Sequence, residues 1–342
     1  MIKKIYLLAI FTIISCTAAM AQETIDVHFS AMGFMDNREY KPFVLRSHTY
    51  NGIRTELDFG FNLDSLNHFV FGANGIHEFG AQPYFLKVNP VAYYSFTGKS
   101  WLFNAGAFPR EGLISDYPRA LLNDTLRYYR PNIEGLLARV HNDHFVETGW
   151  IDWVSRQTNT DREQFIFGFS GKYKPSVKGM FYVSHYFMLE HDAGAAVAVP
   201  DDNIRDNGGG QIRLGLDFGH KTFLDSLSIE AGGMMSFERV RGLDGFQKPT
   251  GFVANAYFGY HRFALYDEFY KGEGHHIMYG DAFYEKKTYN RMDIIWTPFL
   301  YNRFKGQFIL SFHQTPGYQM SNQEAFRITF DLGRRVLARL KN

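Results

Sequence analysis

Residues 51–63, NGIRTELDFGFNL, alternate strictly between two kinds of side chain. One set is Ile53, Thr55, Leu57, Phe59, Phe61 and Leu63, and the other is Arg54, Glu56, Asp58, Gly60 and Asn62. Because successive side chains of a β-strand point to opposite faces, the stretch predicts a strand with one apolar and one polar face. The polar face mixes both signs of charge with glycine, which favours a wall between lipid and water.

The same alternation recurs in GQIRLGLDFG (210–219) and AFRITFDLG (325–333). On this pattern we predict a transmembrane antiparallel β-barrel of about sixteen strands, with fourteen as the alternative count. The run 262–270 has the weakest pattern. The predicted strands lie near 25–34, 51–63, 66–77, 84–97, 100–108, 131–141, 143–154, 163–173, 176–189, 209–219, 225–238, 250–260, 262–270, 288–300, 303–313 and 325–334.

The first 22 residues, MIKKIYLLAIFTIISCTAAMAQ, have a basic start, a short apolar run and small residues around Ala21. They predict a secretory signal peptide over residues 1–21. Ile14, Ser15 and Cys16 also fit a lipoprotein cleavage site, which would leave a lipidated cysteine. Cys16 is the only cysteine, so cleavage after Ala21 would leave no disulfide chemistry.

The composition narrows the class of protein. The formal net charge is +1, which gives no indication of nucleic-acid binding, and 17% of the residues are aromatic. Mean hydropathy is slightly negative. An exported chain that is aromatic-rich, polar on average and patterned as strands is typical of an outer-membrane barrel, because only alternate residues of each strand face lipid.

The lengths of the connections give an independent test. If the chain starts in the periplasm, connections after even-numbered strands should be short periplasmic turns, and the others should be longer external loops. The even-numbered connections, such as Gly98–Lys99 and Lys174–Pro175, are all short, whereas 35–50, 109–130 and 271–287 are long. This alternation of short and long connections supports a barrel with both ends in the periplasm.

With these strands and loops the chain resembles the sixteen-stranded porins and the outer-membrane barrels of Bacteroidetes-type bacteria. The resemblance implies a barrel domain over residues 22–333, contact with outer-membrane lipid, and passage of small hydrophilic solutes. FRITFDL (326–332) is similar to the terminal strand that barrel-assembly machinery recognises. Residues 334–342 then form a short basic periplasmic tail. The oligomeric state stays open, with a trimer as one possibility.

Residues 109–130 would form the third external loop, which in porins folds inward and narrows the pore. A helix from Pro118 to Arg130 would gather Arg119, Asn123, Arg127 and Arg130 on one face, opposite Leu121, Leu122 and Leu126. We predict that these four residues form a pore constriction. The alternative is a helix on the barrel rim, with its arginines paired to carboxylates of the wall.

The polar faces of the strands predict the lumen wall. Its expected members are Arg54, Glu56, Asp58, Arg213, Asp217, Glu230, Asp293, Arg327 and Asp331. Three arginines in a narrow passage would attract anions, and the acidic wall would moderate this. We therefore predict a mild preference for anions.

No catalytic, metal or cofactor motif stands out, and we predict no enzyme activity, metal or cofactor. His275 and His276 in GEGHHIMYG would be solvated, and His185 would be an interfacial histidine. The acidic run PDDNIRDN (200–207) lacks the glycine and final glutamate of a calcium loop.

Three functions are left. The first is a porin, the second is an outer-membrane barrel enzyme of the lipid A-modifying hydrolase type, and the third is a secreted glycan-binding β protein. A filled interior would favour the enzyme, whereas the strand count favours the porin.

Overall fold

The computed structural model describes residues 23–41, 46–197, 202–219 and 221–340. The predicted signal peptide lies outside this range. The strands are β1 (Thr24–Glu39), β2 (His48–Asn62), β3 (Asn67–Glu78), β4 (Lys87–Thr97), β5 (Trp101–Pro109), β6 (Asn132–His141), β7 (Phe145–Ser155), β8 (Glu163–Tyr173), β9 (Phe181–Gly194), β10 (Arg205–Asp217), β11 (Ser226–Val240), β12 (Thr250–Tyr260), β13 (Phe263–Gly272), β14 (Thr288–Tyr301), β15 (Phe304–Gln314), β16 (Ser321–Asp331) and β17 (Arg335–Arg339).

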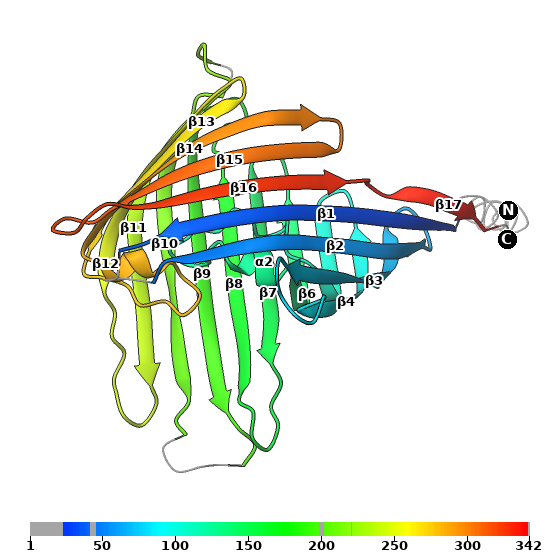
Figure 1. Ribbon diagram of the computed structural model, residues 1–342, viewed down its shortest axis with the longest axis horizontal. Helices are drawn as coiled ribbons and strands as arrows, with labels where there is room; N and C mark the ends of the chain where they lie inside the picture. The colour runs from blue at the N-terminus through cyan, green and yellow to red at the C-terminus, as the bar shows by residue number, and fades with distance from the viewer. Residues whose placement is uncertain (1–22, 42–45, 198–201, 220, 341–342) are drawn as a thin grey trace, which may run out of the picture.

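The first sixteen strands form one closed antiparallel barrel (Figure 1). Each strand pairs with the next along the chain, and β1 closes the sheet by pairing with β16 from Ser30–Asp331 to Glu39–Asn322. The predicted all-β barrel of sixteen strands is therefore confirmed. Among the described residues no helix is long and apolar enough to cross a membrane.

β17 is an extra strand that the sequence did not predict. It pairs with the first residues of β1, from Thr24–Arg339 to Val27–Arg335, and projects with them beyond the neighbouring strands (Figure 1). The two ends of the described chain therefore lie side by side, and Leu340 N donates to Glu23 O. The periplasmic position of this segment stays a prediction.

The alternation in the sequence sets which face each side chain occupies. On β10, Ile212 and Leu214 are more than half exposed, whereas their neighbours Gln211 and Arg213 are buried. In a barrel, exposed apolar side chains face lipid and buried polar side chains face the lumen. The inward and outward faces of β10 are thus those that the pattern predicts.

The connections at one end of the barrel are short. The turns at His261 and Asn302 reverse the chain within two residues and place both residues at positive φ, 54° and 53°. Asparagine tolerates this conformation well, and histidine less so. At β9 the predicted start at 176 was wrong, because Gly179 N donates to Ser176 O and closes a turn before Phe181.

The two longest described connections at the other end, residues 110–131 and 273–287, enter the barrel, and together we call them the plug. The loop 110–131 folds inward as predicted, but a helix over 118–130 was wrong: only α2 (Leu126–Tyr129) is α-helical. Turns at Pro118, which accepts from Leu121 N and Leu122 N, precede it. The loop 273–287 contains the short 3₁₀ helix η1 (Ala282–Glu285).

Candidate functional site

The two segments of the plug are bound to each other by their backbones. Asn123 N donates to Tyr279 O over 2.7 Å, and Asp281 N donates to Arg119 O over 2.9 Å. Gly280 lies against the carbonyl of Ala120 so closely that a Cβ there would collide with it. The segments therefore act as one body inside the barrel, although the 141 residues from 132 to 272 separate them in sequence.

An apolar cluster fixes the plug to the wall. Leu121, Phe283 and Tyr284 of the plug are almost fully buried. Their cluster includes wall residues from strands on many sides of the barrel: Phe108, Ile133, Leu137, Trp150, Ile166, Met188, Met234, Val253, Tyr270 and Tyr289. Close packing of this kind leaves little space for solute at this level.

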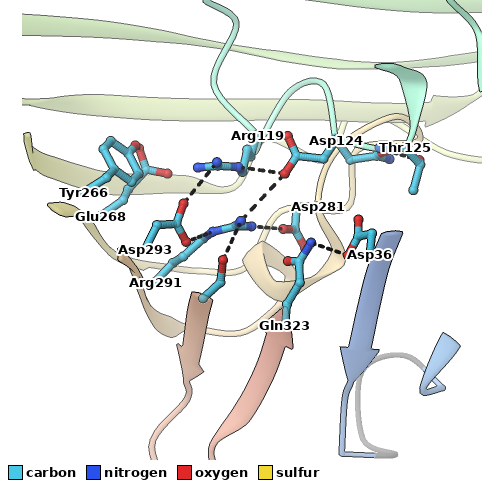
Figure 2. A network of polar contacts seen from close by, with 12 residues as sticks. Asp36, Arg119, Asp124, Thr125, Tyr266, Glu268, Asp281, Arg291, Asp293 and Gln323 are labelled. Carbon is cyan, nitrogen blue, oxygen red and sulfur yellow. Dashed lines mark hydrogen bonds and ion pairs between the residues drawn. The ribbon is translucent and has the colours of Figure 1, made fainter. Parts of the chain in front are cut away.

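A network of ion pairs joins the plug to β14 (Figure 2). Arg119 binds Asp124 and Asp293, each over 3.1 Å, and Arg291 binds Asp293 over 2.8 Å. Arg291 also approaches Asp124 at 3.7 Å and Asp281 at 3.8 Å. Burial alone would raise the pKa of Asp124, but the two guanidiniums hold it well below its usual range.

The other three residues of the predicted constriction also have partners. The Asn123 amide donates to Gly280 O over 3.3 Å, and Arg127 pairs with the exposed Glu111 at 3.2 Å. Arg130 lies 3.5 Å from Asp152 of β7. Asp152 was not among the predicted site residues, because alternation places a side chain on a face but does not reveal its partner. Arg110 also binds this carboxylate.

Several residues predicted for the lumen wall contact the plug. Arg54 donates to the carbonyl of Arg127, and Arg327 donates to the Tyr128 hydroxyl over 2.8 Å. Asp293 accepts from Arg119, as described above. The wall therefore positions the plug through polar as well as apolar contacts.

The remaining predicted wall residues pair with other residues outside the plug. Arg213 binds Glu230 over 3.3 Å and Glu268 over 3.1 Å, and Asp217 lies 3.6 Å from Lys174. The last three, Glu56, Asp58 and Asp331, surround His28.

Two cavities border the ion network. One, of about 490 Å³, is lined by Arg54, Lys172 and Glu230 among others, and the other, of about 310 Å³, by His275 and Gln323 among others. Asn123 and Asp124 line both. The lumen is thus divided at the level of the predicted constriction, and the role of its residues in solute passage stays a prediction.

A second polar group lies on the outer surface of the barrel. His191 Nδ1 donates to Asp206 Oδ1 over 2.8 Å. Arg239 and Arg241 donate to the same carboxylate over 2.8 and 2.9 Å. Asp206 is on the lipid-facing side of β10. Its partners in the sheet are His191 of β9 and Arg239 of β11.

The register fixes the level of this group. His191 pairs with Phe165 on β8, and Phe165 pairs with Trp153 on β7, near the long-loop end of the barrel. The Phe165 and His191 rings lie 5.1 Å apart. Tryptophan is enriched at the boundary between lipid and water, and this indicates that the His191–Asp206 pair lies near that boundary.

Sequence patterns alone did not single out this pair. Its members are fifteen residues apart on two strands, and Asp206 seemed to belong to the acidic run 200–207, of which 200 and 201 lie outside the described residues. Only strand register brings Arg239 and Arg241 to it.

The other histidines have different surroundings. The expectation that His275 is solvated was wrong: its side chain is buried, and Ser236 Oγ lies 2.8 Å from its Nδ1. Burial lowers the pKa of His275 to about 4. His276 is exposed and binds Glu238. His185 faces outward, 3.2 Å from Glu147.

Comparison with solved structures supports the fold. The loop L8 deletion mutant of OmpT, an outer membrane protein of Vibrio cholerae, matches with a TM-score of 0.57 at 10% identity, covering 91% of this chain and 99% of that one. The anion-selective porin of Comamonas acidovorans matches with a TM-score of 0.56 at 10% identity, covering 91% and 100%. The barrel and these neighbours place the chain in the Gram-negative outer membrane, as predicted.

Sequence comparison gives different information. No curated protein matches the chain. Residues 17–339 match a family model described as Lipid A 3'-O-deacylase-type. That model describes enzymes, so our prediction that the chain has no enzyme activity was wrong. Sequence patterns missed this activity because no catalytic motif stands out along the chain.

Proposed function

The chain belongs to the Lipid A 3'-O-deacylase-type family, and on that premise we propose that it hydrolyses an acyl ester of lipid A in the outer leaflet. The porin neighbours share its fold alone. The filled lumen also supports a hydrolase, because a barrel that acts on lipid needs an accessible outer surface and no open channel.

The observation that carries the proposal is the His191–Asp206 pair. Asp206 holds the Nδ1–H of His191, and no hydrogen bond within the described residues engages Nε2. A histidine oriented in this way by a carboxylate has the arrangement of a general base. Its position on the outer face, level with Trp153, gives it access to an ester bond of a membrane lipid.

The reaction would use water as the nucleophile. His191 Nε2 would take a proton from water while the hydroxide adds to the ester carbonyl. The tetrahedral intermediate would then release the sugar alkoxide, which would recover the proton from His191. Arg239 and Arg241 keep N–H donors beyond those bound to Asp206, and these donors could stabilise the oxyanion or a headgroup phosphate.

The surface next to the pair is apolar, as contact with the acyl chains of a lipid requires. Gly208 and Gly210 follow Asp206 on the lipid-facing side of β10, in register with Leu189 and Phe187 of β9. The rings of Phe187 and Phe237 lie 6.0 Å apart across this glycine strip. A Cβ at Gly208 would lie only 2.8 Å from the Phe237 ring. The Phe237 ring therefore lies over Gly208, and the two rings cover the glycine strip with a closely packed apolar surface.

A channel for small solutes is the second candidate function. It is favoured by the two cavities that share Asn123 and Asp124, because displacement of the plug would join them. This candidate requires the plug to move, whereas the hydrolase does not.

The test is release of fatty acid from purified lipid A by the intact protein in detergent, followed by mass spectrometry. We expect His191→Gln to lower the rate by at least about 100-fold, the usual scale for a general base. His185→Gln is the matched control, since His185 is also an outward histidine beside a carboxylate, and it should retain the rate.

Two results would contradict this assignment. Full activity of His191→Gln would exclude the outer pair, and loss of activity in Ser236→Ala would move the site to the buried Ser236–His275 pair. Absence of any acyl release by the unmodified protein, together with conductance in planar bilayers, would favour the channel.

A further inference from the structure

A polar cluster independent of the plug and of the outer pair lies at the short-turn end of the lumen. His28 of β1 faces Glu56 and Asp58 of β2. One ligand atom from each of the three residues lies within 4.8 Å of the others. Glu56 and Asp58 are buried, and the His28 side chain is 17% exposed.

The distances within the cluster match a shared metal ion. His28 Nδ1 lies 2.9 Å from Asp58 Oδ2 and 3.9 Å from Glu56 Oε1. Ligands of a tetrahedral Zn²⁺ ion, each bound at about 2.0–2.2 Å, lie roughly 3.4 Å from one another. The two observed distances lie on either side of this value, so each would change by about 0.5 Å, and the Glu56 and Asp58 oxygens lie within 4.8 Å of one another.

Each of the three side chains has its other polar atom held from outside the cluster. His28 Nε2 donates to Asp331 Oδ1 over 3.0 Å, a contact across the β1–β16 seam. Arg334 binds Asp58 Oδ1 over 2.9 Å, and the Asn74 amide reaches Glu56 Oε2 at 3.4 Å. A histidine that ligates a metal usually donates its second N–H to a carboxylate in this way.

The local charge also favours a cation. Asp26, Glu56, Asp58 and Asp331 bring four carboxylates to this part of the lumen. Arg334 is the only lysine or arginine within ion-pair distance of any of them in the described part of the chain. Within these residues no hydrogen bond reaches Glu56 Oε1, the oxygen that faces His28. Buried charge without such compensation is costly.

We propose that His28, Glu56 and Asp58 bind a divalent transition-metal ion, for which Zn²⁺ is the probe, with water as the fourth ligand. A nitrogen and two carboxylate oxygens are ligands that Zn²⁺ accepts, whereas Ca²⁺ prefers six or more oxygens. The ion would join β1 to β2 beside the seam that closes the barrel. It would thereby stabilise the closed barrel at the end where β17 is attached.

Isothermal titration of the metal-stripped, tag-free protein in detergent with ZnCl₂ tests this site. We expect one ion per chain, and at least about 100-fold weaker binding in His28→Gln and Glu56→Gln. Asp331→Asn, which removes only the outer partner, should weaken binding about 10- to 100-fold. His68→Gln is the control, because His68 also lies near the mouth but binds Asn62.

A second measurement keeps the test independent of folding defects. Zn²⁺ should raise the temperature at which the folded barrel converts to its slower-migrating form on a gel, and Asp331→Asn should reduce this rise. Lack of Zn²⁺ binding, binding unchanged in both ligand variants, or a preference for Ca²⁺ over Zn²⁺ would overturn the proposal. His28 would then be an imidazolium that bridges carboxylates without a metal.

Discussion

Replacing Arg119 by methionine should loosen the plug while leaving the barrel closed. Arg119 binds Asp124 of its own loop and Asp293 of β14 (Figure 2). It therefore stabilises the fold of the loop and also attaches the loop to the wall. Methionine keeps much of the side-chain volume and removes the charge. The change therefore tests the ion network rather than the packing of the plug.

The structure limits how much free energy of plug docking the substitution should remove. Breaking a buried pair by removing one partner costs about 3–5 kcal/mol when the other charge is left uncompensated. Here Asp293 keeps Arg291 at 2.8 Å, and the Arg119 side chain is 26% exposed to the cavity. We therefore expect a loss of about 2–3 kcal/mol, which corresponds to roughly 30- to 160-fold more frequent opening of the plug.

Hydrogen exchange measured by mass spectrometry reads this opening directly. The amides of Leu121 and Leu122, which donate to Pro118 O, should exchange faster by that factor. Arg127→Met is the matched control on the same loop. Arg127 pairs with Glu111, which is 57% exposed, so its loss should cost less than about 1 kcal/mol, or fivefold. Equal exchange in the two variants would refute the idea that the network holds the plug.

Three further outcomes are expected. Leu214→Arg puts a charge against acyl chains and should destabilise the folded barrel by about 2–4 kcal/mol near the midplane of the membrane. The measurement is the yield of barrel that shifts on a gel after heating. Arg213→Leu should leave the lipid-facing surface intact, because Arg213 is buried in the lumen. Deletion of 115–130 with a short Gly/Ser bridge should raise single-channel conductance in planar bilayers; unchanged conductance would mean that the loop does not obstruct the lumen. The pKa of His275 is lowered to about 4, so the unfolded chain binds more protons between pH 6.5 and 4. The contribution of neutral His275 to the stability of the plug should therefore be full above pH 6.5 and should fall on acidification. Proteolysis of the loop measures this stability. His275→Gln should abolish the pH dependence.

The barrel could be predicted from the sequence because its determinants are local. Period-two alternation gives the face of the residues in the alternating strands, and the turn lengths support the order of the strands without any tertiary information. The seam was implied as well, since the first and last strands of a closed barrel must pair. β17 was missed because RVLAR has no alternating face and becomes a strand only by pairing with β1.

The interior could be predicted only in part. The apolar residues Leu121, Leu122 and Leu126 indicated that the third loop needs a wall to pack on, and they are buried as expected. Nothing in GEGHHIMYG indicated that residues 273–287 would enter the lumen too. That requires the backbone contact at Gly280, which depends on the position of the other loop.

Alternation along each strand thus determined the closed barrel and the direction of its side chains, because lipid and water select residues one position at a time. The tertiary structure decided which inward charges neutralise one another, that two loops fill the lumen, and that His191 meets Asp206 on the outer face. These contacts join residues from separate strands, and their distances depend on strand register and loop path. The chemistry of this protein therefore depends on the tertiary structure, whereas its architecture is already present in the sequence.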